Sequence, residues 1–150
     1  MGIECGAPPG RRDTGWAMSQ ENVDFIQEAS DALHKGDLQL VEALLEGALD
    51  PAFEYQSLAL DQVHTGLRGM RDFFADMHEV WRDYDQEIEE LVDLGDDIVV
   101  VLRVAARGTG SGVPIAQQRV WLWTFRDGRA VRAKAFRSKR EALEAVGLAE

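Results

Sequence analysis

The amino-acid sequence predicts one α+β domain, in which a curled, largely antiparallel sheet carries helices packed on one face. Two observations lead to this prediction. Apolar residues recur at helical spacing in the first half of the chain, whereas the second half holds apolar or alternating stretches broken by short turns. The 150 residues are enough for one domain that buries roughly 70% of its unfolded surface.

Residues 19–48 are expected to form a helical hairpin with one apolar face. Ser19 is a suitable N-cap for the first helix, and Asp37 is a suitable N-cap for the second. The stretch before the hairpin is rich in glycine, contains a Pro-Pro pair and has no apolar periodicity. We therefore expect a disordered leader at 1–17 and a folded domain at 18–150.

After the hairpin the sequence predicts one strand, a third helix and then a series of strands. Alternation at 52–58 predicts a half-buried strand, and a loop through Gly66 leads to a third amphipathic helix at about 69–82. Hairpin-connected strands and a short final helix follow, at 84–94, 97–107, 114–125, 129–137 and from Ser138.

The composition excludes several classes of partner and site. A net charge of −11 and a sequence pI near 4.7 repel nucleic acid, so we expect no such partner. No apolar run reaches the ~20 residues of a membrane helix, so we expect no membrane contact. Cys5 is the only cysteine, which excludes an internal disulfide. A cytoplasmic protein is the default expectation.

Neither a metal nor a cofactor is expected. No two of the three histidines, His34, His64 and His78, have metal-ligand spacing on one element. We expect structural roles for His34 and His78. The glycine-rich GTGSG at 108–112 joins two strands, so it lacks the helix N-terminus of a phosphate-binding loop.

Four short motifs resemble a known family. They are HKGDL (34–38), LDPAFEY (49–55), GLRGMRDFF (66–74) and WTFRDGR (123–129). In this order they resemble the SnoaL-like polyketide cyclase family of the nuclear-transport-factor-2-like superfamily, with ketosteroid isomerase and limonene epoxide hydrolase as relatives. The resemblance implies a cone-shaped fold with a curled antiparallel or mixed sheet, and with the helical hairpin and third helix on its concave face. It also implies a pocket between sheet and helices and frequent dimerisation through the outer face.

The acid–base residues of these relatives have no counterparts at the matching positions. The resemblance places the tyrosine, base and acid of ketosteroid isomerase at Ala29, Tyr55 and Gln118, so that chemistry is not expected here. It places the acid of an epoxide hydrolase near Ala135 and the Asp or His of a cyclase near Trp121. The lost residues favour binding over catalysis.

Three polar residues remain as candidates for catalysis. Tyr55 could donate a hydrogen bond, His64 could act as a base and Arg137 could hold an anion. Each also has a structural interpretation, respectively a packed core aromatic, a surface-loop histidine and a solvated strand end. By the resemblance, the candidate ligand-pocket residues are Phe53, Phe74, Gln118, Leu122, Ala133 and Ala135.

The turn at Asp127-Gly128 decides which face carries Trp121 and Trp123. A two-residue loop pairs Trp123 with Arg132 and Trp121 with Lys134, and it puts both tryptophans on the outer face. A three-residue loop slips the register by one and turns both into the pocket. We favour the two-residue loop because it gives each tryptophan a cation–π partner. A homodimer would then cover the apolar outer face.

The sequence leaves three functions open. The favoured one is a SnoaL-like protein that binds a small, largely apolar molecule in the cone pocket, with or without transforming it. The alternatives are a metal-free cyclase, isomerase or hydrolase, and a dimeric interaction module with a filled cone. The small side chains of Ala133 and Ala135 favour a real cavity. Neither the ligand nor a reaction can be named, because one such fold hosts many chemistries.

Overall fold

The structure, a computed structural model, describes residues 11–58 and 62–147, with side chains from Gln20 onward. The side chain of His78, and with it the expected structural role of that residue, lies outside this description. The elements in chain order are α1 (Arg11–Lys35), α2 (Leu38–Ala48), β2 (Leu49–Gln56), β3 (Val63–Thr65), α3 (Gly66–Val80), β4 (Trp81–Asp93), β5 (Asp97–Gly108), β6 (Pro114–Arg126), β7 (Arg129–Phe136) and α4 (Lys139–Ala145).

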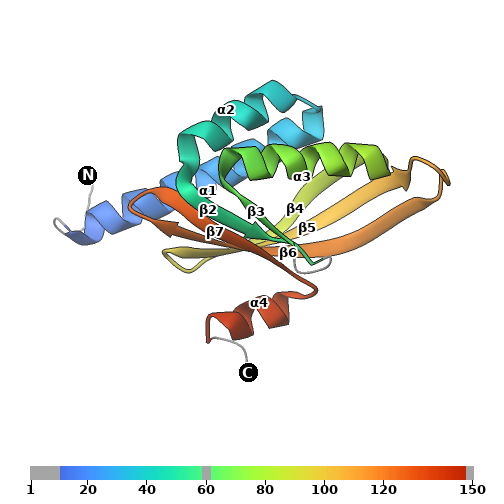
Figure 1. The fold of residues 1–150 in the computed structure, drawn as a ribbon. Coiled ribbons are helices and arrows are strands. Elements are labelled where there is room, and N and C mark those ends of the chain that lie inside the picture. Colours follow the sequence, from blue (N-terminus) through green and yellow to red (C-terminus); the bar gives the residue numbers. More distant parts are fainter. Residues whose placement is uncertain (1–10, 59–61, 148–150) are drawn as a thin grey trace.

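Six strands form one sheet in the order β3-β2-β7-β6-β5-β4. β2 and β7 run parallel, and all the other neighbours are antiparallel. The sheet is mixed because the chain leaves β2 through the edge strand β3, and α3 then carries it to the opposite edge at β4. Helices α1, α2 and α3 cover one face, and α4 lies against the other (Figure 1). The predicted α+β fold, with a curled mixed sheet and three helices on its concave face, is confirmed.

The helical hairpin is present, but its first helix starts earlier than predicted. The carboxylate of Asp37 accepts from the backbone N–H of Leu40 at 3.1 Å, as the predicted N-cap of α2 should. Helix α1 begins at Arg11, so Ser19 lies inside the helix and the prediction that it is the N-cap is wrong. Residues 11–17 of the expected leader belong to this helix, and no proline interrupts the sequence from Arg11 to Lys35. The remaining part of the leader lies outside the described residues.

The first half of β5, residues 98–102, is buried on both faces, which explains its continuous apolar sequence. Ile98, Val100 and Leu102 belong to the core under the three helices. Val99 and Val101 belong to a second, smaller core that includes Ala142 of α4. The short final helix is therefore the cover of the outer face at this end of the sheet.

The β6–β7 turn has the predicted length but not the predicted consequence. Arg126 pairs with Arg129 across a two-residue loop, and Asp127 and Gly128 both have positive φ, 52° and 79°, as a type I′ turn requires. Directly after the turn, Phe125 pairs with Ala130 but Thr124 pairs with Arg132, so Val131 is an extra residue in β7. This β-bulge shifts the register of all the following pairs by one.

Because of the bulge, the tryptophans lie inside the cone. Trp123 pairs with Ala133 and Trp121 with Ala135, instead of with Arg132 and Lys134. A one-residue shift moves a whole set of side chains to the other face. The prediction that Trp121 and Trp123 lie on the outer face and meet a dimer partner there is therefore wrong.

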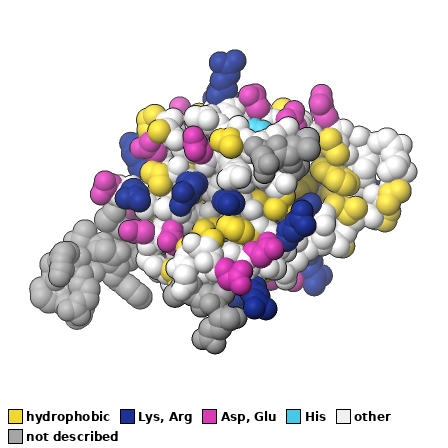
Figure 2. Space-filling view, turned by 60° about the horizontal axis from the view of Figure 1, so that its bottom comes forward, with side chains coloured by type: hydrophobic (Ala, Val, Ile, Leu, Met, Phe, Trp, Pro, Cys, Tyr) yellow, Lys and Arg dark blue, Asp and Glu magenta, His cyan; other side chains and the backbone are white. Residues whose placement is uncertain are grey.

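The outer face is largely polar. Figure 2 shows acidic and basic side chains intermixed on this side of the molecule, with apolar side chains between them. Arg103 pairs with Glu89 at 3.3 Å and Lys139 with Glu90 at 2.7 Å. Such exposed pairs contribute about 0–1 kcal/mol each. This face no longer has the exposed tryptophans that made a dimer the expected cover.

Candidate functional site

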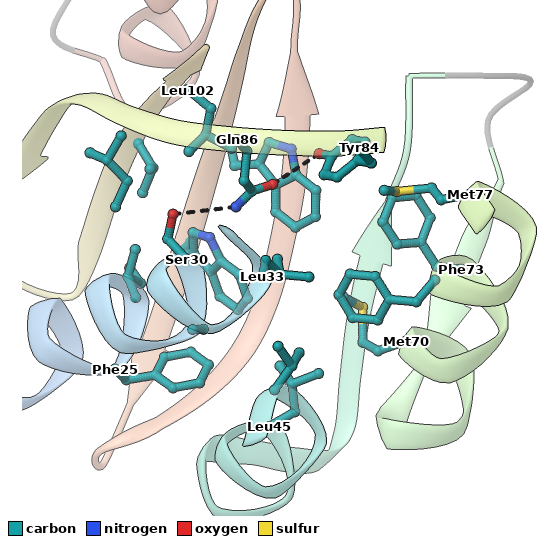
Figure 3. Close-up of a pocket in the computed structure, with 18 residues that line it drawn as sticks. Phe25, Ser30, Leu33, Leu45, Met70, Phe73, Met77, Tyr84, Gln86 and Leu102 are labelled. Atoms are coloured by element: carbon teal, nitrogen blue, oxygen red, sulfur yellow. Dashed lines mark hydrogen bonds between the residues drawn. The ribbon is translucent and has the colours of Figure 1, made fainter. Parts of the chain in front are cut away.

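Two adjoining cavities lie between the concave face of the sheet and the helices. The first, which we call the sheet chamber, has a volume of about 220 Å³ and lies among residues of β2, α3 and β4 to β7. The second, the helix chamber, has about 60 Å³ and lies among α1, α2, α3 and the facing strands (Figure 3). The two chambers share five lining residues, Phe73, Met77, Tyr84, Leu102 and Trp121.

A column of stacked rings, the aromatic ladder, contributes its three middle rings, Tyr55, Trp121 and Trp123, to the walls of the chambers. It consists of His64, Tyr55, Trp121, Trp123 and Phe125, with successive ring centroids 5.9, 4.3, 5.8 and 6.2 Å apart. Strand β7 lies between the two strands that supply Tyr55 and Trp121. It contributes only the small side chains of Ala133 and Ala135 at this place, so the larger rings can meet above it.

A short polar chain crosses the helix chamber. The hydroxyl of Tyr84 donates to Oε1 of Gln86 at 2.9 Å, and Nε2 of Gln86 donates to Oγ of Ser30 at 3.4 Å (Figure 3). Tyr84 and Gln86 share the inward face of β4, and Ser30 faces them from α1. Gln86 and Ser30 are buried, so the chain gives each polar group a partner away from water.

Both tyrosines of the chain face these cavities and are protonated at neutral pH. Burial raises the pKa of Tyr84 from its ordinary value of 10.0 to about 12. Burial also raises the pKa of Tyr55, which lines the sheet chamber and is 3% exposed. The charge of Arg119 offsets a small part of the rise in both pKa values. Each hydroxyl is therefore a hydrogen-bond donor and not a base.

Arg119 is a cation on the wall of an otherwise mostly apolar chamber. It pairs with Leu102 across β5–β6 and lies two residues before Trp121, on the same face of β6. Its side chain is half-buried. In the part of the chain that the structure describes, no carboxylate lies within 4.0 Å of its guanidinium and no side chain hydrogen-bonds to it.

Some of the residues predicted for the pocket lie on the concave face. Tyr55 and Ala135 line the sheet chamber, and Phe74 lines the helix chamber. Phe53 and Ala133 are fully buried on the same face, packed against Trp123, and reach neither chamber.

Four other predicted residues do not line the pocket. The bulge in β7 explains two of them, because it reverses which face of β6 points inward. Leu122 belongs to the core beneath α4, and Gln118 is exposed with its amide on Glu89, so neither lines the pocket. His64 stacks on the ring of Tyr55 but lines neither chamber. Arg137 is exposed beyond the end of β7, and its backbone N–H donates to Glu141. The predicted Tyr55, His64 and Arg137 group does not converge on one cavity.

The sequence analysis missed Arg119, Tyr84, Gln86 and Ser30. Alternation along β6 would have placed Arg119 beside Trp121 on the inward face, once the tryptophans were known to point inward. Alternation along β4 likewise places Tyr84 and Gln86 on one face of that strand. Ser30 lies on the buried face of α1, and a serine at helical spacing gives no signal of its own for a pocket.

The chemistry of the walls follows from this inventory. Among the described lining residues of the two chambers, the polar groups are Ser30, Ser57, Tyr55, Tyr84, Gln86 and Arg119, with no carboxylate or imidazole. Over residues 11–58 and 62–147, no group of three or more His, Cys, Asp or Glu side chains could hold a metal ion. The imidazole of His34 is exposed and forms a hydrogen bond with the carboxylate of Asp85 in β4, which raises the pKa of His34.

Comparisons with known proteins agree with this fold. A family model described as a SnoaL-like domain matches residues 26–133. Search of the curated proteins gave no match. None of the helices in the described part of the chain has the length and apolar character needed to cross a bilayer.

Solved structures share the architecture at low sequence identity. A protein described as a SnoaL-like polyketide cyclase, from Jannaschia sp. CCS1, is 20% identical with a TM-score of 0.70, over 87% of this chain and 90% of that one. A nuclear-transport-factor-2-like protein from Burkholderia pseudomallei K96243 is 18% identical with a TM-score of 0.68, over 85% and 98%. A protein from Catenulispora acidiphila DSM 44928 with a ketosteroid isomerase-like fold, in complex with trimethylamine, is 15% identical with a TM-score of 0.65, over 83% and 92%.

Proposed function

The chain belongs to the SnoaL-like domain family, and from that premise we propose that it binds a small, largely apolar molecule in the sheet chamber. The observation that carries the proposal is the chamber itself, a cavity of about 220 Å³ with aromatic and aliphatic walls and few polar groups. Ligand sites are typically concave and mostly apolar, with a small number of placed polar groups that orient the ligand. The trimethylamine bound by the Catenulispora relative supports a small-molecule ligand for this fold without identifying the one bound here.

Binding is better supported than acid–base catalysis. The described walls offer donors and a cation, because Tyr55 and Tyr84 have raised pKa values and Arg119 is always charged. A cyclase, isomerase or hydrolase that moves a proton also needs a base, and the described lining contains none. Enzymatic turnover therefore stays the alternative, and a filled cone is disfavoured by the cavity.

A matched pair of substitutions tests the proposal. Ala106 is buried and lines the sheet chamber, whereas its neighbour Ala105 is exposed and points to the opposite face. Ala106→Phe should fill the chamber, and Ala105→Phe should leave it open. Native mass spectrometry of protein purified gently from its own cells should show a small-molecule adduct on the wild type and on Ala105→Phe. The same adduct on Ala106→Phe would show that the ligand binds elsewhere.

The location and the assembly of the protein stay predictions. Its acidic composition and single cysteine favour the cytoplasm and disfavour nucleic acid as a partner. The family resemblance still implies a homodimer. Such a dimer would have to form through the polar outer face, without a contribution from the two tryptophans.

A further inference from the structure

Arg119 stands out because its charge has no partner among the residues that the structure describes. Arg103, one strand away on the outer face, pairs with Glu89, and Arg107 approaches Asp83 at 4.0 Å. Arg119 is half-buried on the chamber wall, and the described residues provide no anion for it. A cation that is partly withdrawn from water is stabilised by an anion in the same place.

The hydroxyl of Tyr55 lies on the same wall and also lacks a partner within residues 20–58 and 62–147. Tyr55 is 3% exposed and lines the sheet chamber. Its ring is held by Trp121 and His64, but its hydroxyl makes no hydrogen bond to any described residue. Buried polar groups are nearly always paired, so an unpaired hydroxyl on a cavity wall indicates a ligand atom that accepts from it.

Tyr84 can supply a second donor by reversing the polar chain. In the arrangement described above, its proton goes to Oε1 of Gln86. If the amide of Gln86 turns over, Nε2 donates to the hydroxyl of Tyr84, and Oε1 accepts the proton of Ser30. Both arrangements satisfy all three residues. The reversed one leaves the proton of Tyr84 free for a ligand.

We propose that Arg119, Tyr55 and Tyr84 form an anion subsite for the carboxylate of a small aromatic acid, whose ring lies against the aromatic wall of the sheet chamber. The proposal rests on the function proposed above and specifies its ligand class. A guanidinium matches a carboxylate in geometry and can donate two parallel hydrogen bonds. The rings of Trp121 and Phe73 provide the flat apolar surface beside it.

Two probes of the same shape, one anionic and one neutral, test the subsite. 2-Naphthoate carries a carboxylate, and 2-naphthamide is its neutral counterpart of nearly the same size. Isothermal titration calorimetry should show that the wild type binds the acid at least about tenfold more tightly than the amide, as one charge-assisted hydrogen bond contributes about that factor. Arg119→Met should remove this preference. Arg103→Met, which removes a cation from the outer face, should retain it.

The outcomes separate the subsite from the cavity. Equal binding of both probes by the wild type, blocked by Ala106→Phe, would overturn the anion subsite and leave the binding function intact. A preference for the acid that survives Arg119→Met would likewise overturn the subsite. Binding of neither probe to the wild type would count against both proposals.

Discussion

The ring of Trp121 stacks on the ring of Tyr55 with centroids 4.3 Å apart and an interplanar angle of 16°. The two residues belong to β6 and β2, which are not neighbours in the sheet, so the contact passes over β7. Ala135 pairs directly with Trp121, and its small side chain leaves the room for this contact. The alanines of β7 thus make room for aromatic side chains of the neighbouring strands. Of these alanines, only Ala135 also lines the sheet chamber.

Trp121→Glu should unfold the protein. The substitution places a carboxylate against Tyr55 and Phe73, where no cation except Arg119 lines the described wall. We expect a loss of more than about 4 kcal/mol in the free energy of unfolding. Far-ultraviolet circular dichroism with urea titration measures it. Ala116→Glu, at an exposed position of the same strand, should remain within about 0.5 kcal/mol of the wild type. A folded, stable Trp121→Glu protein would return the tryptophans to the outer face.

Tyr55→Phe and Tyr84→Phe should differ in their effect on stability, because only the hydroxyl of Tyr84 has a hydrogen-bond partner among the described residues. The Tyr55 hydroxyl makes no hydrogen bond to the described part of the chain, so its removal should cost less than about 0.5 kcal/mol of stability while it weakens the binding of 2-naphthoate. The hydroxyl of Tyr84 donates to Gln86, so its removal leaves a buried acceptor unpaired at a cost of about 1–3 kcal/mol. Urea unfolding and calorimetry on both variants measure the two effects. Equal destabilisation by both would mean that the Tyr55 hydroxyl has a structural partner.

The tyrosine pKa values predict a loss of stability at high pH. The folded-state pKa of Tyr84, about 12, lies above its ordinary value of 10.0, and that of Tyr55 is raised as well. Above pH 10 the folded protein therefore holds more protons than the unfolded chain. The stability contributed by the two hydroxyls is complete below pH 10 and is lost as the pH rises through the folded-state values.

Ultraviolet titration of the phenolate measures this effect directly, because Tyr55 and Tyr84 are the only tyrosines in the sequence. The folded protein should show no phenolate at pH 10, whereas the chain unfolded in urea should be about half ionised there. A normal titration curve in the folded protein would show that water reaches both hydroxyls.

Gly69→Ala should destabilise the packing of α3 against β3. A Cβ at Gly69 would lie 2.6 Å from the carbonyl carbon of His64, which is backbone and cannot move aside cheaply. We expect a loss of about 1–3 kcal/mol. Gly47→Ala in α2, where a Cβ meets nothing within 4 Å, should instead gain about 0.5–1 kcal/mol. Thermal unfolding of the two variants compares them, and opposite signs are the expected result.

The elements could be predicted from the sequence because each has a local cause. The cap at Asp37, the alternation of β2 and the Asp127-Gly128 turn act within a few residues, and all three are present as predicted. The bulge at Val131 has no comparable local signal. It inserts one residue without a glycine, so neither the turn nor the composition of β7 indicates it.

The bulge at Val131 also decides which residues of β6 line the cavity. Without the bulge, alternation assigns Leu122 and Gln118 to the cavity and sends Trp121 and Arg119 outside. With it, the two sets exchange places. Tyr55 lines the sheet chamber, in the stretch from Glu54 to Gln56 where β2 pairs in register with β7 after the shift between Leu49 and Glu54. His64 and Arg137 were placed by analogy with relatives, and their side chains do not reach either chamber.

The aromatic ladder also gives the protein an intrinsic spectroscopic signal. Two of the four tryptophans, Trp121 and Trp123, stack at 5.8 Å, and Trp121 borders both chambers. Indole rings held this close couple electronically, and the sign and intensity of their near-ultraviolet circular dichroism depend on their mutual orientation. Because Trp121 borders both chambers, a molecule that contacts its ring in either one should change this signal. A compound collection can therefore be screened against the unlabelled protein by watching its intrinsic spectrum.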